Sequence, residues 1–467
     1  MRIMDVLVIG CGAAGVAALR RLHEAGLRVL GLEAADRIGG RILTVPFGAS
    51  NIDIGAAWCH GEKDNIVFEQ ANPLGLLDAD KPQTRLYVLS NGELVPESTG
   101  EAILHALEQE VNSADKYTTR SISECVRTAA NTNSTLKKDP ELSQAFIKWF
   151  EKNNHLGGED DPKEGKSLRS IVEYWNSEGS FWLNWKGRGY TTILDLLMNK
   201  YPDASEETPL QILLNKEVEN IRWGTSQDSG NPLVQVVCKD GSLYAAKSVI
   251  VTVSVGVLKN RLPQLFTPPL PVDKLNTIKT MQLCILAKIY IEFEEPWWAE
   301  SAANLMVLWR DVDKAQFSAD EKWVTEIFGL ITISHHPNVL LAWLNGNGVE
   351  AMEKKSEDEV RAGVQKLLDI VFKKFNVTPI KNILRTQWAT DPLTGCAYAY
   401  RSVALEEAGG SAVILSEPLY HGNKFPVVCF AGEATSHHRF GMVHGAVESG
   451  FREADRLIEN FKRLGYL

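Results

Sequence analysis

The chain has 467 residues, of which 44% are hydrophobic and 23% charged, and its formal net charge is -10. This composition is typical of globular proteins, and the length exceeds what one hydrophobic core usually supports, so we expect more than one domain. The negative charge argues against nucleic acid as a partner, because nucleic-acid binding requires a clustered basic surface.

Seven cysteines are scattered along the chain without the spacing of a zinc site or a disulfide framework, so we expect no metal. This usage is typical of a reducing compartment. The first residues have a strand pattern rather than that of a signal peptide, and the most apolar stretch, 248–258, is too short to span a bilayer. The final residues, Arg-Leu-Gly-Tyr-Leu, are not the peroxisomal signal Ser-Lys-Leu. We therefore expect a cytoplasmic protein with no membrane partner.

The chain opens with the pattern of a strand, a helix and a second strand, at residues 4–9, 13–25 and 28–32. Residues 100–180 read as mostly helical, with a solvated loop at 157–165. The later elements are strands near 234–238, 248–253 and 283–293, a helix over 358–375 and a closing helix over 445–461. Strands that belong with the first unit recur in the middle and at the end, which predicts interleaved domains.

A dinucleotide-binding fingerprint, GxGxxG, lies between the first strand and the first helix. Its positions are Gly10, Gly12, Ala13, Ala14 and Gly15. The first glycine permits a tight turn, the second a close approach to a pyrophosphate, and the third close packing of the helix on the strand. The phosphates then meet free N–H groups at the positive end of the helix dipole. Glu33 ends the second strand, where its carboxylate accepts hydrogen bonds from ribose hydroxyls and disfavours the extra phosphate of NADP.

The segment after the second strand indicates which dinucleotide binds. Residues 33–41, Glu-Ala-Ala-Asp-Arg-Ile-Gly-Gly-Arg, resemble the signature of flavin-containing amine oxidases. In that family the two glycines pass close to the cofactor, and the arginine, here Arg41, binds its phosphates. NAD enzymes have no such extension, so the resemblance implies FAD.

Further blocks of the same family follow in order. Residues 53–61, Asp-Ile-Gly-Ala-Ala-Trp-Cys-His-Gly, resemble the block beside the flavin, and 430–435 with 444–450 resemble the block that returns to it. The resemblance implies that Glu433 binds the ribityl and phosphate region and that the amides around Met442 and Val443 face the pyrimidine ring. It also implies that the backbone of Val218 meets the adenine. The other implied FAD contacts are Gly55, Ala56, Ala57, Trp58, Trp388 and Gly432.

The blocks span nearly the whole chain, and within the family it looks most like polyamine oxidases of the spermine and N-acetylpolyamine type. The implied fold is α/β, with a Rossmann-like FAD-binding domain interleaved with an α+β substrate-binding domain. We expect the FAD-binding domain to comprise residues 1–80, 190–270 and 385–467. The substrate-binding domain is then expected to comprise residues 81–189 and 271–384.

Lys288 is the first candidate for chemistry. Residues 283–293 alternate as a strand, and Lys288 falls on the face opposite to Leu283 and Ile289. The pattern alone also allows a lysine on a half-exposed strand. The resemblance implies instead that Lys288 holds a water against the reactive nitrogen of the flavin and assists the reaction with oxygen.

His60 and Tyr398 are the other catalytic candidates. The resemblance places His60 in the substrate channel, where we expect it to orient the amine and favour its neutral form. It makes Tyr398 an aromatic wall beside the flavin face, which attracts a cationic amine. The opposite wall maps to Met442, so the aromatic cage is incomplete, and Ala57 stands where mammalian polyamine oxidases tend to carry a polar residue.

We expect FAD to be held without a covalent bond. Monoamine oxidases attach their flavin through a cysteine immediately before the tyrosine that matches Tyr398, but Ala397 occupies that position here. Cys396 lies one residue earlier, and a shift of one residue along a strand turns a side chain to the opposite face.

The implied activity is oxidation of a small amine by oxygen. A polyamine (spermine, spermidine or an N-acetyl derivative) would yield an aldehyde, a shorter amine and hydrogen peroxide. Alternatives are a monoamine oxidase, expected to carry a membrane-anchoring C-terminal helix, and an L-amino-acid oxidase, which needs an arginine for the substrate carboxylate. A histone demethylase would carry additional modules. A catalytically silent FAD-binding protein is disfavoured by Lys288 together with the flavin blocks. The sequence does not tell whether the chain has protein partners.

Overall fold

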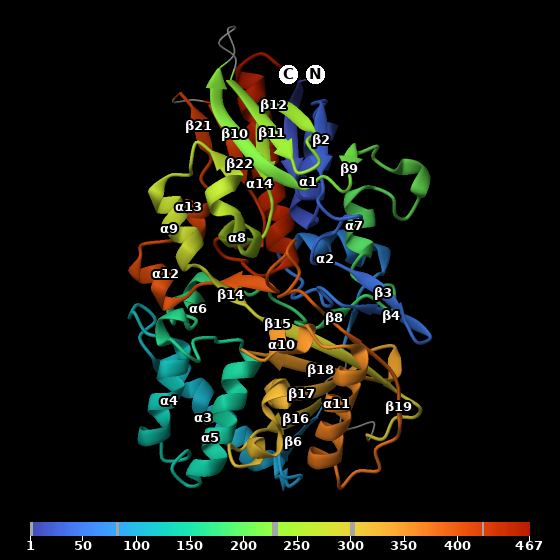
Figure 1. Ribbon diagram of the computed structural model, residues 1–467, viewed down its shortest axis with the longest axis vertical. Helices are drawn as coiled ribbons and strands as arrows, with labels where there is room; N and C mark the ends of the chain where they lie inside the picture. The colour runs from blue at the N-terminus through green and yellow to red at the C-terminus, as the bar shows by residue number, and fades with distance from the viewer. Residues whose placement is uncertain (1–2, 81–83, 227–231, 299–303, 423–424) are drawn as a thin grey trace.

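The computed structural model describes residues 3–80, 84–226, 232–298, 304–422 and 425–467. Two sheets form its framework, one at the end of the molecule that holds both termini and one at the opposite end (Figure 1). Short paired strands and connecting segments lie between them.

The sheet near the termini has nine strands within the described residues, seven of them in the order β13-β10-β11-β12-β1-β2-β9. β1 (Met4–Ile9) lies between β12 (Leu243–Val251) and β2 (Val29–Leu32) and is parallel to both. β22 (Phe425–Phe430) runs parallel to β12 on its other side. β1 is an almost fully buried apolar run, as expected for a parallel strand covered on both faces. Strands from the beginning, middle and end of the chain therefore share one sheet.

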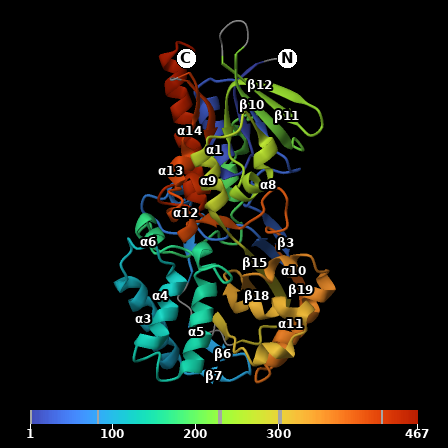
Figure 2. The ribbon, with the colours of Figure 1, turned by 60° about the vertical axis from the view of Figure 1, so that its left-hand side comes forward.

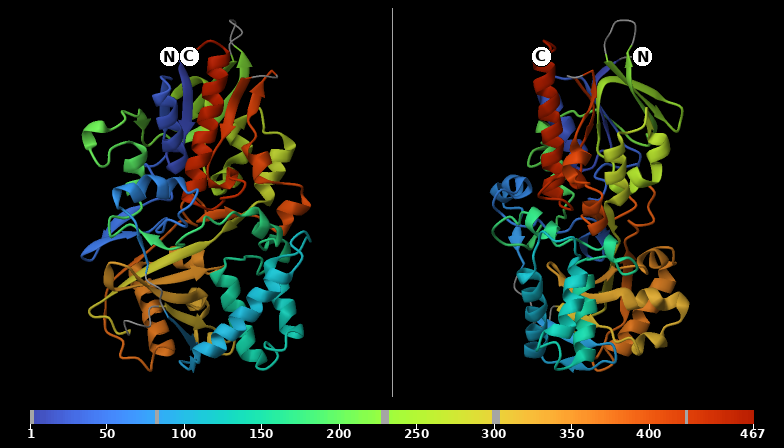
Figure 3. Two further views of the ribbon diagram at one scale, coloured as in Figure 1. Left: turned by 180° about the vertical axis from the view of Figure 1, so that it is seen from behind. Right: turned by 90° about the vertical axis from the view of Figure 1, so that its left-hand side faces the viewer.

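Two helices that are far apart in sequence pack side by side on this sheet. They are α1 (Ala13–Glu24) and α14 (Val443–Arg463), which lie next to each other when the molecule is seen from behind (Figure 3). Gly450 of α14 meets the backbone of Ala14, and a Cβ at this glycine would overlap the Ala14 carbonyl group. The remaining strands of the sheet are β9 (Ile212–Leu213), β10 (Val218–Ser226), β11 (Pro232–Cys238), β13 (Phe266–Thr267) and β21 (Leu419–His421).

The second sheet has the strand order β19-β15-β18-β17-β16-β6-β7 and is mostly antiparallel. Its strands are β6 (Arg85–Leu89), β7 (Leu94–Val95), β15 (Leu286–Phe293), β16 (Asn304–Leu308), β17 (Ile327–Ile333), β18 (His336–Asn345) and β19 (Ile380–Arg385). Figure 2 shows helices α3 to α5 on one side and α10 and α11 on the other. Those helices are α3 (Glu97–Ser113), α4 (Ile122–Thr132), α5 (Pro140–Asn153), α10 (Val349–Glu353) and α11 (Glu357–Val371).

The elements between the sheets include three two-stranded pairs. These are β3 (Thr44–Phe47) with β4 (Ser50–Asp53), β5 (Asp78–Ala79) with β8 (Leu183–Asn184), and β14 (Gln282–Cys284) with β20 (Tyr398–Tyr400). The remaining helices are α2 (Ile66–Ala71), α6 (Arg169–Glu173), α7 (Thr192–Leu197), α8 (Val255–Leu265), α9 (Val272–Thr280), α12 (Val403–Glu407) and α13 (Ala412–Ser416).

Several predicted elements differ from the structure in their bounds; the helix predicted over 358–375, for example, is α11, which ends at Val371. The strand expected over residues 283–293 is two strands, β14 and β15, because the chain leaves one pairing partner at Ile285 and joins another. Every residue of β15 is buried, so the alternative of a half-exposed lysine at Lys288 is wrong. The closing helix begins at Val443 rather than at residue 445. Among the described helices, none combines the length and the apolar character needed to cross a membrane.

Candidate active site

A cavity of about 1200 Å³ runs between the two sheets. It is lined by the carboxyl ends of β1 and β2, the start of α14, and side chains from β15, β17 and β18 of the second sheet. Of the predicted site residues, Gly15 alone is outside its lining, which fits a glycine needed for packing rather than for contact with a ligand. The sequence therefore identified positions that the fold brings to one place.

Two of the fingerprint glycines, Gly10 and Gly12, line this cavity. Gly10 has φ of 88°, a backbone conformation that favours glycine, and a Cβ on Gly15 would overlap the carbonyl group of Gly10. A Cβ on Gly12 would meet no protein atom closer than 3.7 Å. Gly12 is also the N-cap residue of α1. The missing side chain thus keeps the N-terminus of a helix open to an anion.

Glu33 lies at the end of β2, beside the fingerprint. Its carboxylate accepts hydrogen bonds from the amide of Cys11 at 2.7 Å and from the amide of Ala35 at 2.9 Å. These bonds fix the carboxylate, which is 8% exposed, at the edge of the cavity. A fixed acceptor in this place suits the ribose hydroxyls of a dinucleotide.

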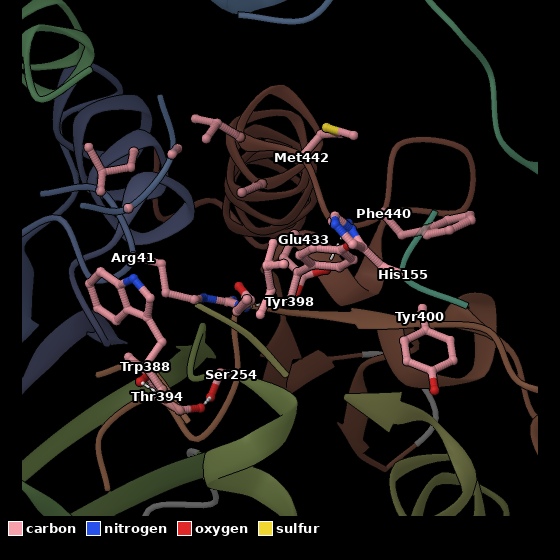
Figure 4. A pocket seen from close by; sticks show the side chains of 18 of the residues that line it. Arg41, His155, Ser254, Trp388, Thr394, Tyr398, Tyr400, Glu433, Phe440 and Met442 are labelled. Carbon is pink, nitrogen blue, oxygen red and sulfur yellow. Dashed lines mark hydrogen bonds and ion pairs between the residues drawn. The ribbon is translucent and has the colours of Figure 1, made fainter. Parts of the chain in front are cut away.

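Arg41 and Glu433 form an ion pair that joins two of the predicted flavin blocks (Figure 4). Nη1 of Arg41 donates to the Glu433 carboxylate and to the carbonyl group of Ala397, each at 3.0 Å. The Glu433 carboxylate also accepts from the amides of Ala399 and Gly441. The carboxylate of Glu433 thus connects Arg41 with β20 and with the segment that precedes α14.

Lys288 projects from the middle of β15 into the cavity and is 7% exposed. Its Nζ donates to the carbonyl oxygens of Gly55 at 2.6 Å and Asp53 at 3.1 Å, in the predicted second flavin block. Burial lowers the pKa of Lys288 to about 8, while the Asp53 carboxylate opposes this change. Burial also raises the pKa of Asp53 to about 6. The structure therefore brings an ammonium group that is easily deprotonated to the backbone expected beside the flavin.

His60 lies among aromatic rings on the same side of the cavity. Its ring centroid is 4.3 Å from that of Phe181 and 5.5 Å from that of Trp182. Nδ1 is 2.8 Å from the carbonyl oxygen of Phe181, which fixes the ring orientation. Burial lowers the pKa of His60, and the charge of Lys288 lowers it further. A neutral imidazole can orient an amine without repelling it.

Tyr398 also lines the cavity, at the start of β20. Its hydroxyl oxygen is 2.5 Å from Nδ1 of His155, a residue that the sequence analysis did not identify (Figure 4). Cys396 is fully buried, and its Sγ is 3.8 Å from Nη1 of Arg41. In the view of Figure 4, Met442 and Phe440 lie above the ring of Tyr398. Aromatic and thioether groups thus border this part of the cavity.

The remaining predicted contacts are distributed along the cavity. Val218, the first residue of β10, lines it together with Lys216 and Glu217. Trp388 donates from Nε1 to the carbonyl oxygen of Ile54 at 2.9 Å. The other lining positions are Ala13, Ala14, Gly55, Ala56, Ala57, Trp58, Gly432, Met442 and Val443.

Several lining residues were missed, because their segments carry no local motif. Trp343 of β18 lies with its ring centroid 6.4 Å from that of Trp58 and 6.5 Å from that of His155. Asp80 and Lys166 also line the cavity. The one local sequence signal was the Leu-Gly-Gly that follows His155. In the structure His155 has φ of 50°, an uncommon conformation outside glycine.

The sequence matches the family model described as flavin containing amine oxidoreductase over residues 13–458. The chain belongs to this family. Its members use FAD, so the predicted family and cofactor are confirmed. The residues that line the cavity fit FAD. Gly12 and the start of α1 suit the pyrophosphate, Glu33 suits a ribose, and the long cavity continues past Lys288.

The enzyme is also similar to curated proteins along almost its full length. It is 30% identical to the Homo sapiens protein named peroxisomal N(1)-acetyl-spermine/spermidine oxidase, covering 97% of this chain and 94% of that relative. The Bos taurus protein of the same name is 29% identical with the same coverage. Probable polyamine oxidase 5 of Arabidopsis thaliana is 25% identical over 98% of each chain.

Proposed function

We propose that the enzyme oxidises a polyamine (spermine, spermidine or an N-acetyl derivative) with oxygen, giving an aldehyde, a shorter amine and hydrogen peroxide. The relatives named as polyamine oxidases support this substrate class. The observation that carries the proposal is the continuity of one cavity. The same cavity leads from the dinucleotide fingerprint to the buried Lys288 and then between aromatic side chains suited to an amine.

FAD supplies the acceptor for two electrons and a proton from the carbon beside the amine nitrogen. The chain's residues position the substrate for that transfer. His60, with its lowered pKa, accepts a hydrogen bond from the amine and favours the neutral form. The hydroxyl group of Tyr398 is held by Nδ1 of His155, and the ring of Tyr398 forms an aromatic wall that orients the amine. Lys288 holds a water in the cavity, because its two carbonyl partners leave one of its three donors free.

The proposal includes the division of the chain into two discontinuous domains. We assign residues 1–80, 190–270 and 385–467 to FAD binding and residues 81–189 and 271–384 to substrate binding. The strand order of the two sheets supports this division, because β1, β12 and β22 share one sheet while β6, β15 and β18 share the other. We also retain the proposed cytoplasmic location, on the scattered cysteine spacing alone.

The test is peroxide release from purified enzyme with a panel of spermine, spermidine, their N-acetyl forms, monoamines and L-amino acids. We expect peroxide with at least one polyamine, with a kcat/KM more than tenfold above that for any monoamine or amino acid. Preference for an amino acid would replace the proposed substrate class. An FAD-loaded enzyme that releases no peroxide with any amine would support the silent FAD-binding alternative.

A further inference from the structure

Asp53 is the last residue of β4, and its backbone and its side chain bond to different parts of the molecule. Its carbonyl oxygen accepts hydrogen bonds from Nζ of Lys288 at 3.1 Å and from the hydroxyl group of Tyr290 at 2.5 Å, both on β15 of the second sheet. Its carboxylate accepts from Oγ1 of Thr44 at 2.5 Å and from the amide of Tyr190 at 2.9 Å. One residue thus connects the second sheet with the hairpin of β3 and β4, which lies between the two sheets (Figure 1), and with the segment that precedes α7.

The partners of the Asp53 carboxylate are themselves fixed. Thr44 and Thr191 form two reciprocal hydrogen bonds, in which the amide of each donates to the hydroxyl oxygen of the other at 3.0 and 3.1 Å. Gly189 has φ of 88°, and a Cβ there would lie 2.2 Å from the side chain of Thr44, so the segment before α7 packs directly against β3. Oδ1 of Asp53 accepts a donor from each of these two segments. The carboxylate is therefore anchored on both sides.

The carbonyl oxygens of three successive residues that begin at Asp53 accept side-chain donors. Those of Asp53 and Gly55 accept from Nζ of Lys288. That of Ile54 accepts from Nε1 of Trp388 at 2.9 Å. The direction of the Lys288 ammonium group therefore depends on the conformation of a short backbone segment, and the side chain of its first residue is the anchored carboxylate.

We infer that Asp53 is a positioning residue for Lys288, because its anchored carboxylate fixes the backbone segment whose carbonyl oxygens orient the ammonium group. This inference rests on the role of Lys288 in the proposed function, and it extends the site to a side chain outside the cavity lining. When the anchor is lost, the two carbonyl oxygens are free to shift. A buried ammonium group that loses an acceptor is costly, so its orientation changes with them.

The carboxylate of Asp53 also acts on Lys288 through its charge. Burial lowers the pKa of Lys288, and the negative charge of Asp53 opposes this effect and favours the ammonium form. Strands β18 and β19 bring Trp343 and Thr386 against Lys288, and neither side chain titrates. His60 is mainly neutral at pH 7, because burial lowers its pKa.

Two tyrosines also face this pair. Tyr290 donates to the carbonyl oxygen of Asp53, and the backbone amide of Tyr190 donates to its carboxylate. Burial raises the pKa of each phenol far above its ordinary value, so both stay neutral. Among the residues that the structure describes, the carboxylate whose charge acts on Lys288 at neutral pH is therefore that of Asp53, which has a pKa of about 6.

The main test is a double-mutant cycle of Asp53→Ala and Lys288→Met, measured on both half-reactions of the flavin. Asp53→Ala alone should slow the half-reaction that depends on Lys288 by about tenfold, because the hydrogen bonds that orient the ammonium group are weakened. In the Lys288→Met background, the same change should slow this half-reaction by less than about twofold. Additive losses would show that Asp53 acts independently of Lys288 and would overturn the inference.

Asp53→Asn separates the anchor from the charge. The amide oxygen of the new side chain accepts from Thr44 and Tyr190 as the carboxylate does, so at low pH the rate should stay within about threefold of the parent rate. The ammonium form of Lys288 loses an opposite charge, so the inflection near pH 8 in the rate should move about one unit to lower pH. An inflection at the same pH as in the parent would overturn the inference for the charge.

The pH dependence of stability gives the same result without turnover. In the flavin-free parent, burial of the ammonium form destabilises the fold, so the free energy of unfolding should rise as pH increases above about 8. In Asp53→Asn this rise should begin about one unit lower. The matched control is Asp313→Asn, a buried carboxylate that accepts from the hydroxyl group of Ser90 outside the cavity lining. It should leave both the inflection and the rise in place, and an equal shift in this control would overturn the inference.

These tests distinguish failure of the inference from failure of the proposed function. Reoxidation of photoreduced flavin by oxygen requires no amine, and the stability curve requires no turnover. If Lys288→Met leaves both half-reactions unchanged, the proposed role of Lys288 is wrong and this inference is overturned with it. If Lys288→Met slows a half-reaction but Asp53→Ala does not, the inference alone is overturned.

Discussion

Replacement of Lys288 by methionine separates the folding role of this residue from its chemical role. The side chain keeps its length and its apolar stem but loses the ammonium group, which donates to the carbonyl oxygens of Asp53 and Gly55. Tyr290 still donates to the carbonyl oxygen of Asp53 at 2.5 Å, so only Gly55 loses its partner completely. We therefore expect the fold and the FAD content to be retained.

The magnitudes for this variant follow from the same contacts. Lowering the pKa of Lys288 to about 8 from its ordinary 10.5 means that the buried charge costs about 3 kcal/mol at neutral pH. Removing it offsets the loss of one or two hydrogen bonds, each worth about 1 to 3 kcal/mol when charged. Stability should then change by less than about 2 kcal/mol. The charge of Lys288 acts on the charge that develops in the transition state. Over a distance of about 6 Å and at an effective dielectric near 20, this interaction lowers the barrier by about 3 kcal/mol. The rate should therefore fall about ten- to a hundredfold when the charge is removed.

Stopped-flow absorbance of the flavin measures both half-reactions of Lys288→Met. We expect at least one of them to slow by more than tenfold. In the parent enzyme, the rate of the affected half-reaction should also show an inflection near pH 8 when it is plotted against pH. The variant should lack this inflection. Below that pH the ammonium form is present and its burial destabilises the fold, so stability should rise as pH increases from about 8 to 10 in the parent alone. Unchanged rates in both half-reactions would remove Lys288 from the mechanism.

Three other outcomes are expected. Gly12→Ala should leave the unfolding temperature of the FAD-free protein unchanged, because a Cβ at this position has space. It should weaken FAD binding at least tenfold, as measured by fluorescence titration. Equal affinity would contradict the proposed approach of the pyrophosphate to Gly12. His60→Ala should raise KM and alter the pH profile of kcat/KM, so a superimposable profile would count against its role. We expect no covalent bond between Cys396 and the flavin, because this cysteine is fully buried beside Arg41. Acid precipitation should therefore release all of the yellow flavin into the supernatant. Colour retained in the pellet would show a covalent flavin.

The parts of the fold that were predictable depend on local patterns. The first strand, helix and strand follow from an apolar run, a glycine motif and a helical repeat within thirty residues, and the structure places them almost as expected. Alternation also placed Lys288 on the correct face of its strand. It could not show that this face is buried, because the covering backbone near Gly55 is more than two hundred residues away in sequence.

The substrate end of the cavity was less predictable for the same reason. Trp343, His155, Asp80 and Lys166 come from separate elements, and none belongs to a short motif. Their relation depends on the packing of β18 against β15 and on the connection that follows α5. The break at Ile285 is also a tertiary effect, because β14 and β15 pair with different strands. Resemblance to a family predicted the cavity-lining residues that belong to motifs more completely than the lining residues that lie outside them.

Burial acts in one direction on every basic group beside the expected path of the amine. It lowers the pKa of Lys288, of His60 and of His155, in each case as the largest effect. The same desolvation must act on a bound amine, whose ordinary pKa is near 10 and whose neutral form is the one that can be oxidised. We therefore expect the cavity to favour the neutral form of its substrate by excluding water, so that no strong base is needed beside the reacting carbon. Accordingly, kcat should reach its plateau at a pH well below the pKa of the free amine. A plateau reached only near pH 10 would show that the bound nitrogen stays as solvated as it is in water.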